Sequence, residues 1–202
     1  MRPRPYLSYS QMILAEKSPA WYVKIYLEGR NIRNAGMDLG KEIAEAIELD
    51  QETGDPMKDF VIAQLPKFEL RDPIIDIELP ITGKEVIPIR FRPDSIRNNH
   101  TAFKEYKTGS GKWTQKKVNE SVQLPFYATC IYIEDRLIPE AELIWAPTEK
   151  VVDPTGAARF ELTGDIHRFG RTFSYAEVLA MMVRMRRAWK KIEEITNGEI
   201  PL

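Results

Sequence analysis

The sequence predicts an α/β domain in which a central mixed sheet is flanked by helices. Two features indicate this class: segments with helical spacing lie in the first half, in the middle and at the end of the chain, and short runs of branched and aromatic residues lie between them. The 202 residues, 43% of them hydrophobic, are enough for one sizeable core. We therefore expect a single domain over 1–202, with an N-terminal helical segment (1–35), a core (36–136) and C-terminal strands and a helix (137–202).

Four segments place apolar residues at three- and four-residue steps, which is typical of amphipathic helices. They cover 8–29 with an interruption near Pro19, 37–49, 119–136 and 175–195. Six short segments instead have the composition of strands and are mostly bounded by Pro, Gly or Asn. These strands are expected at 68–70, 74–79, 85–91, 101–106, 141–146 and 158–162. Between the two kinds of segment, 51–58 contains Gly54 and Pro56 and is expected to form a loop or a short turn of helix.

The charge and cysteine content exclude several classes of protein. Lys and Arg total 29 against 30 Asp and Glu, so a nucleic-acid partner would have to be bound by a local basic patch. Cys130 is the single cysteine, which excludes an intrachain disulfide and any cluster held by several thiolates. No stretch resembles a signal peptide or a membrane span, so we expect no membrane association and a cytoplasmic location.

The residues that indicate chemistry are Asp94, Glu105 and Lys107. Residues two apart in a strand face the same side, so Glu105 and Lys107 project together while Tyr106 points to the other face. If the strand that ends near Asp94 pairs with the strand of Glu105, the loop 95–100 makes the turn and the two carboxylates lie side by side. The plain alternative is a solvated ion pair on a strand surface.

Two such carboxylates suit a hard divalent cation, which prefers oxygen ligands. The cation would polarise a phosphodiester and lower the pKa of a bound water. Lys107 would orient the nucleophile or offset the charge that develops in the transition state. The three residues are therefore compatible with metal-dependent hydrolysis of a phosphate ester, but taken alone they are explained more simply by a solvated ion pair.

The order of motifs resembles the RecB-type branch of the PD-(D/E)XK nucleases, which includes the CRISPR-adaptation exonucleases. The resemblance covers residues 7–136, and its motifs follow one another in the family's order. They are Leu7 to Gln11 (Leu-Ser-Tyr-Ser-Gln), a helix that begins at Gly40, Asp94 after a strand, the run Glu105-Tyr106-Lys107-Thr108-Gly109, and a helix with Gln123 and Tyr127.

This resemblance implies a restriction-endonuclease-like fold with Asp94, Glu105 and Lys107 as catalytic residues. It also implies Mg²⁺ or Mn²⁺ bound by Asp94, Glu105 and the main-chain carbonyl of Tyr106, with no iron–sulfur cluster because Cys130 stands alone. By analogy the substrate is DNA, attacked as an exonuclease at single strands or duplex ends. The implied setting is recombination, repair or phage DNA metabolism with a partner protein, in a host cytoplasm if the protein is phage-encoded.

One position departs from the family pattern. The helix that begins at Gly40 has Ala44 where relatives commonly carry a histidine ligand. Glu48 lies one turn further on the same helical face, and Glu45 is adjacent to Ala44. We expect Glu48, with Glu45 as second choice, to supply the missing ligand; the alternative for both is an ordinary solvated helix face.

The family places the Gln and Tyr of the last helix near substrate, so Gln123 and Tyr127 are expected substrate-binding residues. An aromatic residue among lysines suits a single strand, which adds Lys112 and Trp113. The alternatives are a core position for Tyr127 and a solvated loop around Trp113. Rival functions are a catalytically impaired nucleic-acid-binding module of the same fold, a structure-specific endonuclease, and a protein-interaction domain.

Overall fold

The computed structural model describes residues 4–31, 35–152, 156 and 158–200. Its main sheet is curved and has the order β1-β4-β5-β6-β7, with β8 also pairing with β6. Only β5 and β6 run parallel, so the sheet is mixed. Its strands are β1 (Leu70–Arg71), β4 (Ser95–Ile96), β5 (Ala102–Gly109), β6 (Glu140–Val152), β7 (Ala158–Leu162) and β8 (His167–Arg171).

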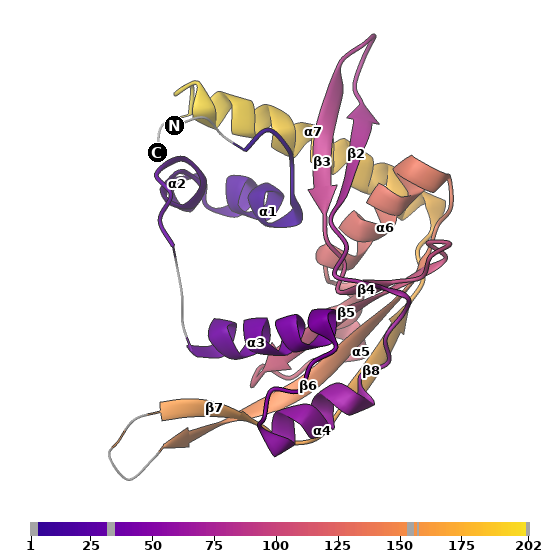
Figure 1. The fold of residues 1–202 in the computed structure, drawn as a ribbon. Coiled ribbons are helices and arrows are strands. Elements are labelled where there is room, and N and C mark those ends of the chain that lie inside the picture. Colours follow the sequence, from indigo (N-terminus) through magenta and orange to yellow (C-terminus); the bar gives the residue numbers. More distant parts are fainter. Residues whose placement is uncertain (1–3, 32–34, 153–155, 157, 201–202) are drawn as a thin grey trace.

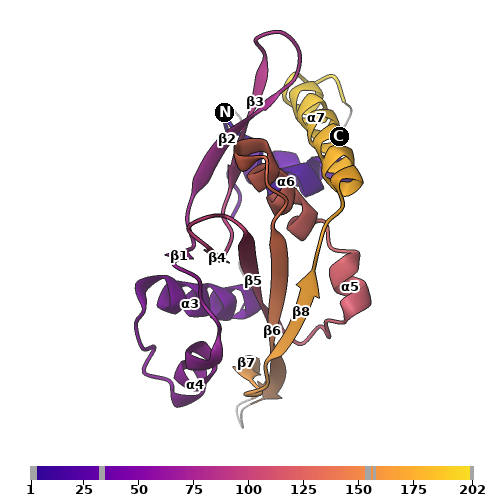
Figure 2. The ribbon, with the colours of Figure 1, turned by 90° about the vertical axis from the view of Figure 1, so that its right-hand side faces the viewer.

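Helices cover both faces of this sheet (Figures 1 and 2). On one side, α3 (Ala35–Leu49) and α4 (Pro56–Gln64) enclose a small apolar core with even-numbered residues of β6 such as Ile144 and Ala146. On the other, α6 (Gln123–Asp135) and α7 (Tyr175–Thr196) build the larger core with Phe103 and Leu143. The predicted class, a central mixed sheet flanked by helices, is confirmed.

The two strands directly before Asp94 do not join the main sheet, contrary to expectation. β2 (Ile75–Pro80) and β3 (Val86–Phe91) pair with each other in a separate antiparallel hairpin. Pro93 lacks an N–H and interrupts the ladder after β3. The short strand β4 then begins beyond Asp94 and pairs with β5, and the turn lies around 97–101 rather than 95–100.

The N-terminal segment and the last helix fold together. The predicted break near Pro19 is confirmed, because α1 (Tyr9–Lys17) ends before α2 (Pro19–Tyr22), which continues into the π-helix η1 (Val23–Leu27). The guanidinium of Arg184 on α7 donates to both carboxylate oxygens of Glu16 on α1, at 2.8 and 2.6 Å. The start of α7 has a capping box in which Ser174 and Glu177 satisfy each other's main-chain N–H.

Besides β4, three elements were not predicted: α4, α5 and β8. The segment 51–58 was expected to form a loop or a short turn of helix, but Asp55 caps α4 and Pro56 begins it, so a nine-residue helix follows. The helix expected at 119–136 is observed as α6, which begins only at Gln123, and the short helix α5 (Gln115–Asn119) precedes it. β8 was not predicted because His-Arg-Phe-Gly-Arg lacks the branched residues typical of strands.

Cys130 lies on α6 with 0% of its surface exposed. Burial raises the pKa of its thiol well above the ordinary value, which keeps it protonated and unreactive. None of the described helices is both long and apolar enough to cross a membrane.

Candidate active site

Asp94 lies at the edge of β5 because β4 is too short to cover that strand. β4 pairs only with Phe103 and Lys104, so the edge beyond them is open. There the Asp94 carboxylate accepts a hydrogen bond of 2.6 Å from the main-chain N–H of Tyr106. The N–H and C=O of one strand residue point to the same side, so the carbonyl of Tyr106 also faces this edge.

Glu105 and Lys107 project together from β5, as the strand alternation predicts. Lys107 Nζ lies 2.5 Å from Glu105 Oε1. Tyr106 points to the opposite face, where its hydroxyl donates to the carbonyl of Pro66 at 2.8 Å. The structure thus brings Asp94, Glu105 and Lys107 to one place, and all three line a cavity of about 520 Å³.

Gln123 and Tyr127 approach the same carboxylate from α6. The side-chain amide of Gln123 donates to Glu105 Oε1 at 2.5 Å and also contacts the Tyr127 hydroxyl at 3.0 Å. Glu105 Oε2 is buried and has no hydrogen-bond partner. An ionised carboxylate oxygen without a partner is costly in a protein interior, so this atom is where a cation fits.

The electrostatics of the cluster also favour a cation. Burial, and then the nearby Glu105 carboxylate, raise the pKa of Asp94 well above its ordinary value. Burial opposes the charge of Lys107, but Glu105 and Asp94 outweigh it and raise the pKa of this ammonium. Burial also raises the pKa of Tyr127, which keeps its hydroxyl protonated. One ammonium therefore faces two carboxylates, and the site carries a deficit of positive charge.

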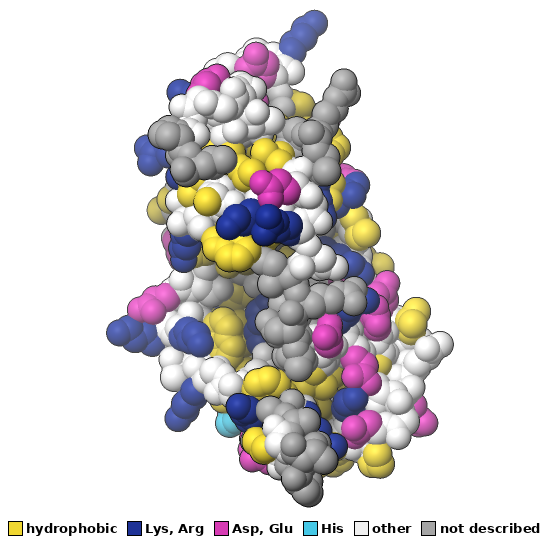
Figure 3. Space-filling model, turned by 90° about the vertical axis from the view of Figure 1, so that its left-hand side faces the viewer, with side chains coloured by type: hydrophobic (Ala, Val, Ile, Leu, Met, Phe, Trp, Pro, Cys, Tyr) yellow, Lys and Arg dark blue, Asp and Glu magenta, His cyan; other side chains and the backbone are white. Residues whose placement is uncertain are grey.

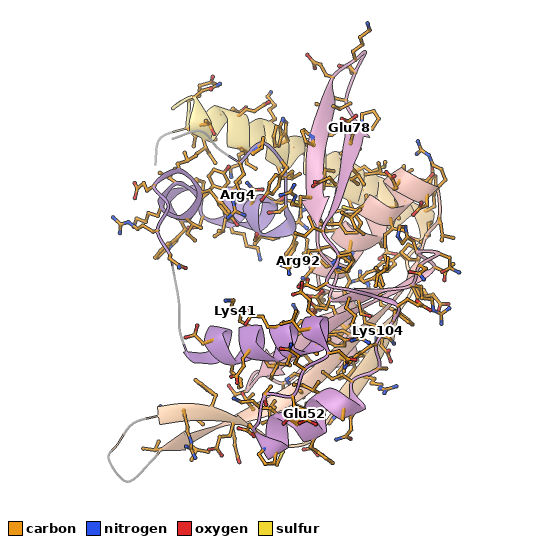
Figure 4. The ribbon with its side chains drawn as sticks, viewed as in Figure 1. Arg4, Lys41, Glu52, Glu78, Arg92 and Lys104 are labelled. Carbon is orange, nitrogen blue, oxygen red and sulfur yellow. The ribbon has the colours of Figure 1, made fainter. Side chains whose placement is uncertain are left out.

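Asp72 is a site residue that sequence reasoning missed. Its main-chain N–H donates to the carbonyl of Asp94 at 2.9 Å, and it lines the same cavity. Burial raises the pKa of Asp72 to about 6, although its partner Arg92 opposes this. Figure 4 shows Arg92 between the base of the β2–β3 hairpin and α3, where it also lies 3.4 Å from Glu48. Glu48 is therefore not among the residues that line the cavity, and its carboxylate lies near the guanidinium of Arg92.

Glu45 is not brought to the cluster. It is exposed on α3 and pairs with Lys41 at 3.1 Å. Ala44, at the position of the family histidine, does line the cavity. The described residues contain no group of three or more His, Cys, Asp or Glu side chains placed to hold a metal ion, so a cation would rely on two carboxylates and a main-chain carbonyl.

The N-terminal motif Leu-Ser-Tyr-Ser-Gln has a structural explanation. Leu7 is buried and bridges to Ile89 of the hairpin, while Ser8 and Gln11 form a capping box at the start of α1. This anchors Tyr9 near the site, where burial raises the pKa of its hydroxyl and Lys107 opposes the rise. The motif thus fixes the first turn of α1 beside Lys107.

A second depression, of about 430 Å³, begins at Gln123 and Tyr127 and continues past three arginines: Arg4, Arg90 and Arg92. Arg90 is fixed by two hydrogen bonds of 2.7 Å to Asp76 and stacks on Tyr6. Figure 3 shows the molecule from the left-hand side of Figure 1, and on this face Lys and Arg side chains gather beside hydrophobic ones.

Lys112 and Trp113 lie elsewhere, in the loop after β5. They line a separate apolar depression with Trp145 and Phe169, and Lys117 stacks on Trp113. The carbonyl of Gly109, at the end of β5, accepts a hydrogen bond from the Trp145 indole at 3.0 Å. Lys112 and Trp113 are therefore not among the residues that line the site cavity, although Ser110 at the start of the same loop is.

The fold and the site together define a mixed α/β protein with a carboxylate–lysine centre at a sheet edge. No protein-family model and no curated protein matches the chain by sequence. Among solved structures, a proposed exonuclease from Eubacterium rectale is similar, with a TM-score of 0.59 and 12% identity over 98% of this chain and 83% of that chain. The protein SSO0001 aligns over 99% of this chain and 79% of its own, at 13% identity and a TM-score of 0.48. At this identity, the first likeness shows a shared fold alone.

Proposed function

We propose that the protein is a metal-dependent nuclease that hydrolyses phosphodiester bonds of DNA. The observation that carries the proposal is the convergence of Asp94, Glu105 and Lys107 on one cavity, with a buried oxygen of Glu105 left without a partner. The fold shared with a proposed exonuclease supports it. The resemblance to RecB-type PD-(D/E)XK nucleases adds the order of motifs around these three residues, from Leu7–Gln11 to Gln123 and Tyr127.

The residues present fit a divalent cation. Asp94, Glu105 and the main-chain carbonyl of Tyr106 would hold Mg²⁺ or Mn²⁺, which prefer oxygen ligands. The bound ion supplies Lewis acidity toward a phosphate oxygen and lowers the pKa of a coordinated water. The unpartnered oxygen of Glu105 and the raised pKa of Asp94 are both relieved by an added positive charge.

The chain's own groups have separate roles in this proposal. Lys107 remains protonated and stabilises negative charge on the phosphodiester as it develops. Gln123 fixes the orientation of Glu105, and Tyr127 in turn contacts the amide of Gln123. Arg92 and the neighbouring Arg4 and Arg90 line the adjoining depression, where the backbone phosphates of a strand would be bound.

The substrate preference follows from the same surfaces. A depression lined by arginines and tyrosines offers phosphate contacts and stacking surfaces, which suit a single strand or a frayed duplex end. We therefore favour exonuclease action, in recombination, repair or phage DNA metabolism. Lys112 and Trp113 would contact the strand further from the site.

The test incubates end-labelled single-stranded and double-stranded DNA, and closed circles, with Mg²⁺ or Mn²⁺ or with EDTA. The wild type is compared with Asp94→Asn and Lys107→Met, and with Lys190→Met as a control because Lys190 is an exposed lysine on α7. We expect metal-dependent loss of linear DNA in the wild type and the control, at least a hundredfold slower in the two site variants.

Each other result selects a rival. Cleavage of closed circles at defined structures would favour a structure-specific endonuclease. DNA that is bound in a salt-dependent way but stays intact with every metal would favour the catalytically impaired binding module. DNA that is neither bound nor cut would leave the protein-interaction domain.

A further inference from the structure

The cavity beside the catalytic residues extends far beyond the room that a metal ion needs. Its volume is about 520 Å³, within the range of small-molecule sites. Asp94 and Glu105 line it together with α3, which lies along one face of the sheet above β6 in Figure 1. The space therefore connects the open edge of β5 with the region beneath α3.

The part beneath α3 is apolar. Leu39, Ile43 and Ile47 supply the helix side, and Phe160 of β7 supplies an aromatic ring. Ala44 leaves this space open because its side chain is short. A flat apolar ligand fits such walls, whereas a hydrated ion or a phosphate does not.

One polar group stands in this apolar region. Thr148 of β6 is 6% exposed, lines the cavity, and its hydroxyl has no hydrogen-bond partner. Buried polar groups in proteins are generally hydrogen-bonded. An unpaired hydroxyl that borders a cavity therefore indicates a ligand with a polar edge. A nucleobase has both properties: apolar faces and a rim of donors and acceptors.

We infer that the space under α3, which we call the base pocket, binds one unpaired nucleobase next to the scissile phosphodiester, packed against Phe160 and hydrogen-bonded to the Thr148 hydroxyl. This inference rests on the proposed nuclease function and specifies its substrate. A base reaches the pocket only when it is unstacked from its neighbours, so the enzyme acts on single strands and frayed ends.

The test measures binding without any hydrolysis. Isothermal titration in the presence of Mg²⁺ compares the four deoxynucleoside 5′-monophosphates with 2-deoxyribose 5-phosphate, which lacks only the base. Stacking and burial of one base add to the binding free energy. We therefore expect the nucleotides to bind at least about tenfold more tightly than the sugar phosphate.

Three variants locate the effect. Thr148→Val keeps the shape and removes the hydroxyl, and it should weaken nucleotide binding about fivefold while leaving the sugar phosphate unaffected. Ala44→Phe fills the base pocket and should abolish the difference between nucleotide and sugar phosphate. Ala180→Phe, at an exposed position of α7, is the matched control. Circular dichroism and thermal unfolding verify that each variant folds.

The outcomes separate this inference from the nuclease proposal. Equal affinities for nucleotide and sugar phosphate, or a difference that survives Ala44→Phe, overturn the base pocket even if DNA is cut in a Lys107-dependent way. A preference for nucleotide over sugar phosphate that Ala44→Phe abolishes supports the pocket even if no DNA is hydrolysed, and the nuclease proposal then fails alone.

Discussion

Gln123 and Lys107 donate to the same oxygen of Glu105, each across 2.5 Å, from two different elements of the fold. All partners of this carboxylate thus gather on Oε1, and Oε2 is left for another ligand. Through Gln123, the helix α6 therefore helps to orient the carboxylate of Glu105, which projects from β5.

Replacement of Gln123 should weaken metal binding. In Gln123→Ala the carboxylate of Glu105 loses its orienting amide, and groups that orient metal ligands typically change affinity 10-fold to 100-fold. We expect the Mg²⁺ concentration for half-maximal nuclease activity to rise at least about tenfold. The control is Gln64→Ala, because Gln64 is exposed on α4 and donates to the carbonyl of Phe60 within its own helix. An unchanged Mg²⁺ dependence would assign Gln123 no positioning role.

Asp94→Asn should stabilise the metal-free protein while it abolishes activity. The asparagine keeps an acceptor for the N–H of Tyr106 but removes a buried charge beside Glu105. Substitutions that relieve such a strained site commonly add about 0.5–2 kcal/mol to the free energy of unfolding. Urea unfolding at pH 7 in EDTA measures the change, with exposed Asp165→Asn as control. A destabilised Asp94→Asn variant would contradict it.

The same substitution should remove a pH dependence. Because the folded-state pKa of Asp94 is raised, the folded protein binds this proton more tightly than the unfolded chain does. The carboxyl therefore stabilises the fold below a pH of about 4, and this contribution is lost as the pH rises through the raised pKa. Unfolding free energies measured in EDTA from pH 4 to 8 should fall more steeply with pH in the wild type than in Asp94→Asn; parallel curves would refute the assignment.

The ion pair between Glu16 and Arg184 should couple α1 to α7. Both carboxylate oxygens accept from one guanidinium, and both side chains are partly buried. A double-mutant cycle with Glu16→Gln and Arg184→Met should give a coupling of about 1 kcal/mol. The pair Lys190 and Glu194, 3.9 Å apart on the surface of α7, should give less than about 0.5 kcal/mol. Equal coupling energies would show that the pair between α1 and α7 contributes no more to stability than a surface pair within one helix.

Gly40 should be sensitive to the side chain of Thr108. A Cβ atom at Gly40 would lie 3.1 Å from the Thr108 hydroxyl, which is a tight contact between α3 and β5. Alanine otherwise favours a helix interior over glycine by about 1 kcal/mol. We therefore expect Gly40→Ala to stabilise the Thr108→Ala protein by about this amount and the native protein by clearly less. Urea unfolding measures the change in the free energy of unfolding. An equal increase in both backgrounds would show that Thr108 moves aside for the added methyl group at no cost.

The features that could be predicted from the sequence are those set by the spacing of residues within one strand or helix. The alternation in β5 places Glu105 and Lys107 on one face, and the four-residue step in α6 places Gln123 beside Tyr127. Whether these groups perform catalysis remains a prediction that the nuclease assay tests.

The rest depends on pairings between distant segments. Asp72 reaches Asp94 only because the two-residue strand β1 pairs with β4, and Asp72-Pro73 alone resembles an ordinary turn. Thr148 reaches the cavity because β6 runs parallel to β5 and continues past it. The pairing of β2 with β3 is likewise set by tertiary packing, which no local pattern contains.

The burial of Cys130 gives experimenters a practical advantage. The chain has no other cysteine, and this one is enclosed in the core with a thiol that stays protonated. A cysteine introduced on the surface, for example in place of Lys112, would then be the single thiol that reacts with a maleimide dye. A fluorophore can thus be attached beside the path proposed for the DNA strand, and the native cysteine need not be removed first.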